Sequence, residues 1–272
     1  MPKGYEFDAS TPCSAGAECL DHSWEASVSV PFTQFPSARN GVIVSRRARL
    51  RERQWRRPMD LRNELDLRRE EAGPVYLDRI EAAAAELDRV AMPRSCKQKG
   101  DVAPDFALLD PAGDLIALSA ILRRGPAVLS FFRGEWCPFC RAELNALLNA
   151  QPEMARMSAT LLLISPEPPS QELVGDVARL GTQIALLRDP MLGVALQYGL
   201  VYLVPEILQQ FYLGQGFDLS NELSTGSWLL PLPADFIVGG DGTIELSYVD
   251  TDFTRRLDPR IIVEELERFQ PP

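Results

Sequence analysis

The sequence has 272 residues, of which 46% are hydrophobic and 24% are charged. These fractions are typical of a soluble globular protein, and at about 150 residues per domain the length allows one large domain or a smaller domain with an extension. The net charge of −10 disfavours binding to nucleic acid or to anionic membranes. The sequence also has no apolar run long enough for a membrane helix and no secretory signal. We therefore expect a cytoplasmic protein, with neither nucleic acid nor a membrane as a partner.

Five cysteines and a single histidine narrow the chemistry further. An odd, sparse set of cysteines is unlike a secreted disulfide scaffold. His22 would have to serve any Cys-His or Ser-His-Asp hydrolase alone, and catalytic zinc or iron sites use several histidines. Cys13, Cys19 and His22 also form a poor metal-ligand spacing, so we expect no metal site. The chemistry is then expected to use cysteine, carboxylates, arginine or a borrowed cofactor, and no cofactor motif is visible.

Residues 1–57 are expected to form a loose tail that ends in an arginine-rich linker, because they show no sustained hydrophobic period. A basic arm for RNA or anionic lipid is one interpretation of the linker. A solvated linker, or sequence upstream of the true start, is the other. The linker contains seven arginines: Arg46, Arg47, Arg49, Arg51, Arg53, Arg56 and Arg57.

Residues 58–99 have the spacing of a helical extension. Leu61, Leu65 and Leu67 recur among charged residues, and a second apolar stripe runs over residues 75–90, after a break at Gly73. We expect two helices that pack on the main domain or on a partner.

Short strands and helices alternate over residues 100–272. An order of strand, helix and strand, followed by a hairpin and a last helix, predicts an α/β domain with a mixed central sheet and helices on both faces. Strands are expected at residues 106–109, 115–118, 126–132, 160–165, 184–187, 234–238 and 243–249. Helices are expected at residues 138–149, 170–180, 190–198, 204–213 and 259–269.

The most informative motif is a Cys-x-x-Cys pair, Cys137 and Cys140, between a buried strand and the next helix. Unpaired N–H groups at a helix start lower the pKa of a thiol there. The spacing brings both sulfurs within one turn, so that one cysteine can attack and the other can resolve the product. Pro138 suits the first helical position. A zinc half-site or two inert core thiols are the alternatives, but a zinc site would need a second ligand pair.

Residues around this motif have two interpretations each. Arg133 either supplies charge to the sulfurs or is a solvated loop residue that pairs with Glu135. Glu135 and Glu143 either relay protons or are surface acids of a helix. Trp136 and Phe139 either shield the sulfurs and form a docking face or pack in the ordinary way.

Two more distant features could also reach the site. Trp228 and the helix around residues 206–211 are candidates for a roof over the pocket. Cys96 is a candidate for a distant resolving thiol, although the Cys-x-x-Cys pair makes one unnecessary.

The segment FFRGEWCPFCRAEL, preceded by GDVAPDFALLDPAGDLIALS and followed by TLLLISPE, resembles the alkyl hydroperoxide reductase and thiol-specific antioxidant family of peroxiredoxin-like proteins, in the thioredoxin superfamily. The segment LPLPADFIVGGDGTIELSYVDTDFTRR resembles the terminal hairpin of the same group. The resemblance covers residues 100–272 and extends to the preceding helices. It implies a thioredoxin-like fold and reduction of hydrogen peroxide or organic hydroperoxides through a cysteine sulfenic acid, with thioredoxin or a similar dithiol as reductant. The oligomeric state stays open, a homodimer included.

The sequence departs from the family pattern at two positions. Matching Cys140 and Glu143 to the family's Cys-x-x-Glu puts Cys137 where typical members have Thr or Ser. Pro233 stands where they have an arginine that steers the peroxide. A proline there resembles the cis-proline of thioredoxins, so we expect a cis peptide between Leu232 and Pro233 next to the Cys137 sulfur. Both departures favour dithiol exchange.

The two arguments disagree about which thiol attacks. The family register favours Cys140, whereas the position at the helix start favours Cys137, which we also expect to be the more exposed. We predict that Cys137 attacks and Cys140 resolves, supported by Arg133, Trp136, Pro138 and Pro233. A thiol peroxidase is the favoured function. A general dithiol-disulfide oxidoreductase and a redox-inert interaction module are the alternatives.

Overall fold

The computed structural model of the protein describes residues 60–90 and 92–268. These residues belong to one unit of the chain, Ala38–Pro272. The predictions for residues 1–57, which include the arginine-rich linker, Cys13, Cys19 and His22, lie outside the described residues. No helix within the described residues is both long and apolar enough to cross a membrane.

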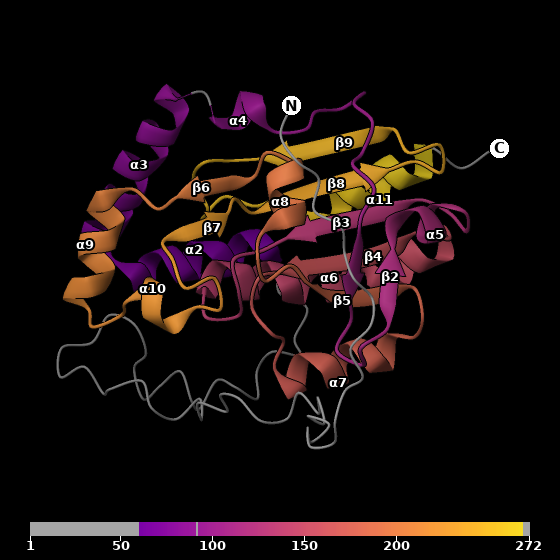
Figure 1. Cartoon of the computed structure of the whole chain (residues 1–272), viewed down its shortest axis with the longest axis horizontal. Coiled ribbons are helices and arrows are strands. Elements are labelled where there is room, and N and C mark those ends of the chain that lie inside the picture. The colour runs from indigo at the N-terminus through magenta and orange to yellow at the C-terminus, as the bar shows by residue number, and fades with distance from the viewer. Residues whose placement is uncertain (1–59, 91, 269–272) are drawn as a thin grey trace, which may run out of the picture. The chain divides into compact units, whose positions relative to one another are not determined.

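A seven-stranded mixed sheet lies at the centre of the described residues (Figure 1). Its strand order is β2-β1-β5-β4-β3-β8-β9. The three central strands β3, β4 and β5 are parallel, whereas β1, β2, β8 and β9 join by antiparallel pairing. The bounds are β1 Ala107–Leu109, β2 Leu115–Ala117, β3 Ala127–Phe131, β4 Thr160–Ser165, β5 Ile184–Arg188, β8 Ala234–Val238 and β9 Ile244–Val249.

Helices connect these strands, and the longest of them begins at the Cys-x-x-Cys motif. This helix, α6, follows β3 and contacts α2, α7 and α11. It runs past the predicted end at residue 149 and past Pro152, because Leu147, Gln151 and Met154 continue its buried face. The bounds are α5 Leu118–Leu122, α6 Pro138–Arg156, α7 Gln171–Leu180, α8 Gly193–Gln197 and α11 Pro259–Arg268.

The predicted fold, a thioredoxin-like α/β domain with a mixed central sheet preceded by a helical extension, is confirmed. The unit β3-α6-β4 comes first, and the β8-β9 hairpin and α11 close the domain in the predicted order. Strand β3 is buried along its whole length, which explains why its sequence is a continuous apolar run without alternation.

The extension forms helices α2 Leu61–Ala72, α3 Pro74–Arg89 and α4 Met92–Ser95. Helix α2 contacts α6, and α3 contacts α9 Glu206–Gly214, so the extension packs on the main domain. Figure 1 shows α3 and α9 side by side. The two predicted helices are confirmed, and Gly73, at φ +77, separates α2 from α3.

A second sheet of two strands, β6 and β7, was not predicted. Each strand has three residues, too few to show a hydrophobic period. The helix expected from Val204 begins only at Glu206, because Pro205 lies in extended conformation at the N-cap. The bounds are β6 Val201–Leu203, α10 Leu219–Glu222 and β7 Leu229–Pro231.

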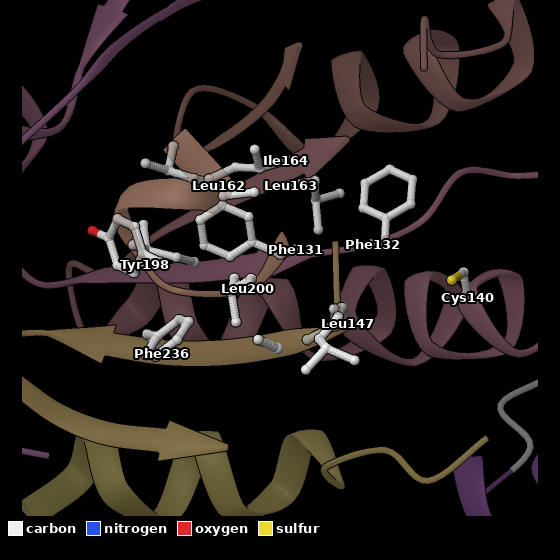
Figure 2. Close-up of a cluster of buried hydrophobic side chains, with 14 of the residues drawn as sticks. Phe131, Phe132, Cys140, Leu147, Leu162, Leu163, Ile164, Tyr198, Leu200 and Phe236 are labelled. Carbon is white, nitrogen blue, oxygen red and sulfur yellow. The ribbon is translucent and has the colours of Figure 1, made fainter. Parts of the chain in front are cut away.

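Figure 2 shows part of the hydrophobic core, which includes residues of the central strands and of α6. Phe131 on β3 and Phe236 on β8 pack against Tyr198, whose ring centroid is 5.2 Å from each of theirs. Cys140 lies at the end of this cluster opposite to Tyr198 in Figure 2. The second thiol is therefore continuous with the apolar core.

The prediction of a cis peptide before Pro233 is wrong, because the described residues contain none. The Leu232 N–H donates to the Leu200 carbonyl at 2.8 Å, which extends the pairing of β6 and β7 by one residue. The trans form, which is the preferred one for most Xaa-Pro bonds, lets the chain continue from β7 into β8. Pro233 itself is buried and precedes Ala234, which pairs with Phe131 at the end of β3.

The segment after α4 lies tightly against Gly199. The Lys97 N–H donates to the Tyr198 carbonyl at 3.0 Å, and the Cys96 thiol donates to the Gly199 carbonyl at 3.2 Å. A Cβ at Gly199 would lie 2.3 Å from the Ser95 carbonyl oxygen. Only glycine therefore fits at this contact between the extension and the domain.

We expect Gly199→Ala to destabilise the protein more than Gly113→Ala. Both glycines have positive φ, +76 and +88, so both variants carry a conformational cost of about 1–2 kcal/mol. A Cβ at Gly113 meets nothing within 4 Å, whereas at Gly199 the clash adds about 1–3 kcal/mol. The free energies of unfolding, measured in urea, test this. Equal losses in the two variants would contradict the contact with Ser95.

Candidate active site

The Cys-x-x-Cys motif begins at the carboxyl end of β3. Cys137 is the N-cap of α6, and Pro138 occupies the first helical turn with an exposed side chain, as the sequence predicts. The Cys137 N–H donates to the Gly134 carbonyl at 3.2 Å, and this tight turn holds Gly134 at φ +137. A Cβ on Gly134 would lie 2.6 Å from the Trp136 ring, so this loop requires glycine.

Both thiols are free and buried. The exposed fractions are 1% for Cys137 and 0% for Cys140, so the expectation that Cys137 is the more exposed thiol is wrong. The reason is that the Cys137 sulfur faces the buried side chain of Arg133 rather than solvent. Exposure therefore does not distinguish the two sulfurs, and their electrostatic surroundings do.

The two thiols have opposite pKa shifts. Burial alone would raise the pKa of Cys137, but the hydrogen bond from the Cys140 thiol and the charges of Arg133 and Arg256 lower it to about 5. Burial and the donated hydrogen bond raise the pKa of Cys140 well above its ordinary value. At neutral pH Cys137 is therefore the thiolate, and Cys140 keeps its proton.

Arg133 is a charged residue in direct contact with Cys137. Its guanidinium is fully buried, and Nη1 donates to the Cys137 sulfur at 3.8 Å. It lies 4.7 Å from the Trp136 ring centroid and 3.9 Å from that of Phe253. Glu135 instead accepts two hydrogen bonds from Ser170. Arg133 is thus neither a solvated loop residue nor a partner of Glu135.

A chain of hydroxyl groups continues from Arg133. Arg133 Nη2 donates to the Tyr212 hydroxyl at 3.1 Å, and that hydroxyl hydrogen-bonds the Tyr76 hydroxyl at 2.8 Å. Tyr212 lies on α9 and Tyr76 on α3, where Tyr76 also stacks on Phe211 at 4.5 Å. The helix predicted as a roof thus reaches the site through Tyr212. Trp228, immediately before β7, is half-buried, and its carbonyl accepts from the Val204 N–H at 2.9 Å.

The aromatic residues of the motif have different surroundings. Trp136 is half-buried, and its indole N–H donates to the Arg133 carbonyl at 3.2 Å. Phe139 is fully buried and packs edge-on against Phe253, with 6.2 Å between the ring centroids. Trp136 therefore borders the site, whereas Phe139 packs in the core.

A second buried arginine lies at Cys140. Arg256 Nη2 donates to the Cys140 sulfur at 3.3 Å, while Nη1 forms an ion pair with Glu143. Burial raises the pKa of Glu143 to about 7, against the opposing charge of Arg256. Glu143 is therefore not a surface acid. The sequence did not indicate Arg256, because nothing local distinguishes it from Arg255 beside it, whose side chain is 64% exposed.

Cys96 lies apart from this pair. Its thiol hydrogen-bonds the carbonyls of Met92 and Gly199, and burial raises its pKa to about 11. Within the described residues, no group of three or more His, Cys, Asp or Glu side chains could hold a metal ion. The chemistry available at this site is thus that of a thiolate, from a thiol of low pKa, beside a second thiol that keeps its proton.

Comparison with known proteins identifies the class. The AhpC/TSA family model matches residues 99–247, and the chain belongs to this family, as its sequence motifs predict. Two Mycobacterium tuberculosis proteins named as candidate peroxiredoxins, from strains CDC 1551 and H37Rv, are each 34% identical over 101 residues. The match covers 37% of this chain and 64% of the length of those relatives.

Solved structures of two related kinds are similar to part of the chain. The peroxidoxin BcpB of Mycobacterium tuberculosis has 22% identity and a TM-score of 0.47, over 64% of this chain and 99% of that one. A structure titled as a thiol:disulfide interchange protein DsbE, from Chlorobium tepidum, has 19% identity and a TM-score of 0.42, over 62% of this chain and 96% of that one.

We expect the Cys137 thiol to titrate near pH 5, far below a free thiol at about 8.5. Because the thiolate is the stabilised form, Cys137 takes up a proton only as the pH falls through this value. Thiolate absorbance of the reduced protein against pH, with Cys140 intact because its hydrogen bond contributes to the shift, measures this pKa. Arg133→Met should raise the midpoint, Arg133→Lys should raise it less, and Arg124→Met, at an exposed position, should leave it unchanged. If Arg133→Met leaves the midpoint unchanged, Arg133 is not a cause of the low pKa of Cys137.

We expect Arg256→Met to destabilise the protein by about 3–5 kcal/mol, because it leaves the buried Glu143 without its partner. Arg255→Met is the matched control and should change the free energy of unfolding by less than about 1 kcal/mol, because that ion pair is exposed. Urea unfolding of the three proteins at neutral pH provides the comparison. Similar losses in both variants would show that the Glu143 ion pair does not stabilise the fold.

Proposed function

We propose that the protein is a thiol peroxidase that reduces hydrogen peroxide or organic hydroperoxides. Cys137 attacks, Cys140 resolves, and thioredoxin or a similar dithiol recycles the enzyme. The observation that carries this proposal is the Cys137 thiolate, which has a buried arginine on one side and a protonated thiol on the other. Membership of the AhpC/TSA family supports it.

The reaction balances in three steps. The Cys137 thiolate attacks one peroxide oxygen, an S–O bond forms as the O–O bond breaks, and the released alkoxide or hydroxide takes up the proton that Cys137 lost on ionisation. The sulfur is oxidised to a sulfenic acid, and the peroxide is reduced to an alcohol or water. Cys140 then attacks the sulfenic sulfur, which forms the disulfide and releases water. A dithiol reductant returns two electrons and two protons.

The electrostatics favour this order of attack. The negative charge on Cys137 is one cause of the raised pKa of Cys140. Oxidation of Cys137 to a neutral sulfenic acid removes that charge, whereas the charge of Arg256 remains 3.3 Å from the Cys140 sulfur. The pKa of Cys140 therefore falls once the sulfenic acid has formed. Cys140 therefore becomes the better nucleophile only after Cys137 has been oxidised.

A general dithiol-disulfide oxidoreductase is the second candidate. The same thiolate and resolving thiol can exchange with a protein disulfide, and Pro233 in place of an arginine favours this reading. The burial of both sulfurs favours the peroxidase, because a hydroperoxide is small, whereas a protein disulfide must bring a bulky chain to Cys137, which is 1% exposed.

We expect peroxide consumption coupled to thioredoxin, thioredoxin reductase and NADPH to exceed the reduction of insulin disulfides by the same preparation. We also expect a sulfenic-acid trap to label Cys137 in the Cys140→Ser protein after peroxide treatment, and Cys137→Ser to abolish turnover. Cys96→Ser is the matched control and should retain activity, because its thiol is engaged by backbone carbonyls away from the pair. If Cys137→Ser still turns over and Cys140 alone is labelled, the roles of the two thiols are reversed.

A further inference from the structure

Two buried polar atoms of residues that interact electrostatically with Cys137 have no hydrogen-bond partner among the described residues: Nε of Arg133 and the hydroxyl of Tyr202. The exposed fractions of the two residues are 0% and 4%. Leaving a buried polar group unpaired costs about 1–3 kcal/mol, so such groups call for an explanation. Two unpaired polar atoms near one reactive sulfur indicate that a bound molecule supplies their missing hydrogen-bond partner.

The fold brings Tyr202 to the end of the sheet where Cys137 lies. Tyr202 is the central residue of β6 and pairs with Leu230 on β7. The chain leaves β7 through Pro233 into β8, whose first residue, Ala234, pairs with Phe131 at the end of β3. The loop that leads from β3 to Cys137 begins at the residue after Phe131. Tyr202 also lies within electrostatic range of Arg133, Tyr212 and both cysteines.

The other polar atoms of Arg133 and the hydroxyls that follow it are already engaged. Arg133 uses Nη1 for the Cys137 sulfur and Nη2 for the Tyr212 hydroxyl. The Tyr212 hydroxyl in turn pairs with Tyr76. The Tyr202 hydroxyl and Arg133 Nε are thus the donors left for a molecule that approaches the thiolate. Burial raises the pKa of Tyr202 to about 12, so its hydroxyl keeps the proton that it would donate.

We propose that the Tyr202 hydroxyl and Arg133 Nε–H bind the O–O group of a hydroperoxide substrate beside Cys137. This inference rests on the proposed peroxidase function and names the residues that recognise its substrate. One peroxide oxygen accepts the attack of the sulfur. The other develops negative charge as the O–O bond breaks, and fixed donors aimed at that charge stabilise the transition state. Both donors act on the O–O group itself, so hydrogen peroxide and alkyl hydroperoxides use them alike.

The test compares Tyr202→Phe with Tyr198→Phe. Each variant removes one buried phenolic hydroxyl and keeps the ring. The Tyr198 hydroxyl donates to the Pro104 carbonyl at 3.1 Å, and Figure 2 places Tyr198 at the end of the core opposite to Cys140. Tyr202→Phe removes an unpaired hydroxyl and should not lower the melting temperature. Loss of activity in that variant is therefore separable from loss of the fold.

The measured quantity is the second-order rate constant for oxidation of Cys137 in a single turnover, with hydrogen peroxide and with tert-butyl hydroperoxide. We expect Tyr202→Phe to lose about 10²-fold with both peroxides, the effect typical of removing one transition-state donor. The reaction of Cys137 with a small aromatic disulfide should change less than about twofold, because it has no O–O group. Tyr198→Phe should react with all three reagents as the wild type does.

The outcomes separate this inference from the proposed function. If the wild type reacts with peroxides and Tyr202→Phe matches Tyr198→Phe, the peroxide site at Tyr202 is wrong and the peroxidase stands. A loss with only one of the two peroxides, or an equal loss with the disulfide, also overturns the shared O–O site. If the wild type itself does not react with either peroxide, both the function and the site are overturned.

Discussion

The full burial of the Arg133 charge is the constraint on which the site depends. A buried guanidinium is costly unless anions, hydrogen bonds and aromatic faces replace its hydration. Here the Cys137 sulfur, the Tyr212 hydroxyl and the rings of Trp136 and Phe253 supply that replacement. The thiolate thus offsets part of the cost of burying the arginine, and the arginine in turn lowers the pKa of the Cys137 thiol. Loss of either group removes part of what compensates the other.

A second buried arginine makes the two sulfurs unequal. Arg256 forms an ion pair with Glu143 as well as donating to Cys140, whereas Arg133 donates to Cys137 and to the uncharged Tyr212 hydroxyl. Burial and the hydrogen bond donated to Cys137 keep the proton on Cys140 while both sulfurs are reduced. The asymmetry arises from the surroundings of the two thiols rather than from their exposure.

The sequence predicted the elements that local patterns encode. The apolar run of β3, the helix start at Pro138 and the β8-β9 hairpin follow from periods and turn residues within a few positions. It did not reveal Tyr212 or Arg256, which lie 79 residues from Arg133 and 116 residues from Cys140 and carry no local signal. The sequence analysis predicted cis at Pro233 and was wrong, since the trans form accompanies the pairing of β6 with β7, two strands too short to predict.

The helical extension contributes to the site although it precedes the segment that matches the family, residues 99–247. Tyr76 on α3 hydrogen-bonds Tyr212 and stacks on Phe211, which joins α3 to the helix that carries the hydrogen-bond partner of Arg133. The orientation of the Tyr212 hydroxyl, and with it one of the hydrogen bonds of Arg133, therefore depends on a residue outside the matched segment. The charge of Arg133 is one cause of the low pKa of Cys137. Three hydrogen bonds, Tyr76–Tyr212, Tyr212–Arg133 and Arg133–Cys137, therefore connect the helical extension to the Cys137 sulfur.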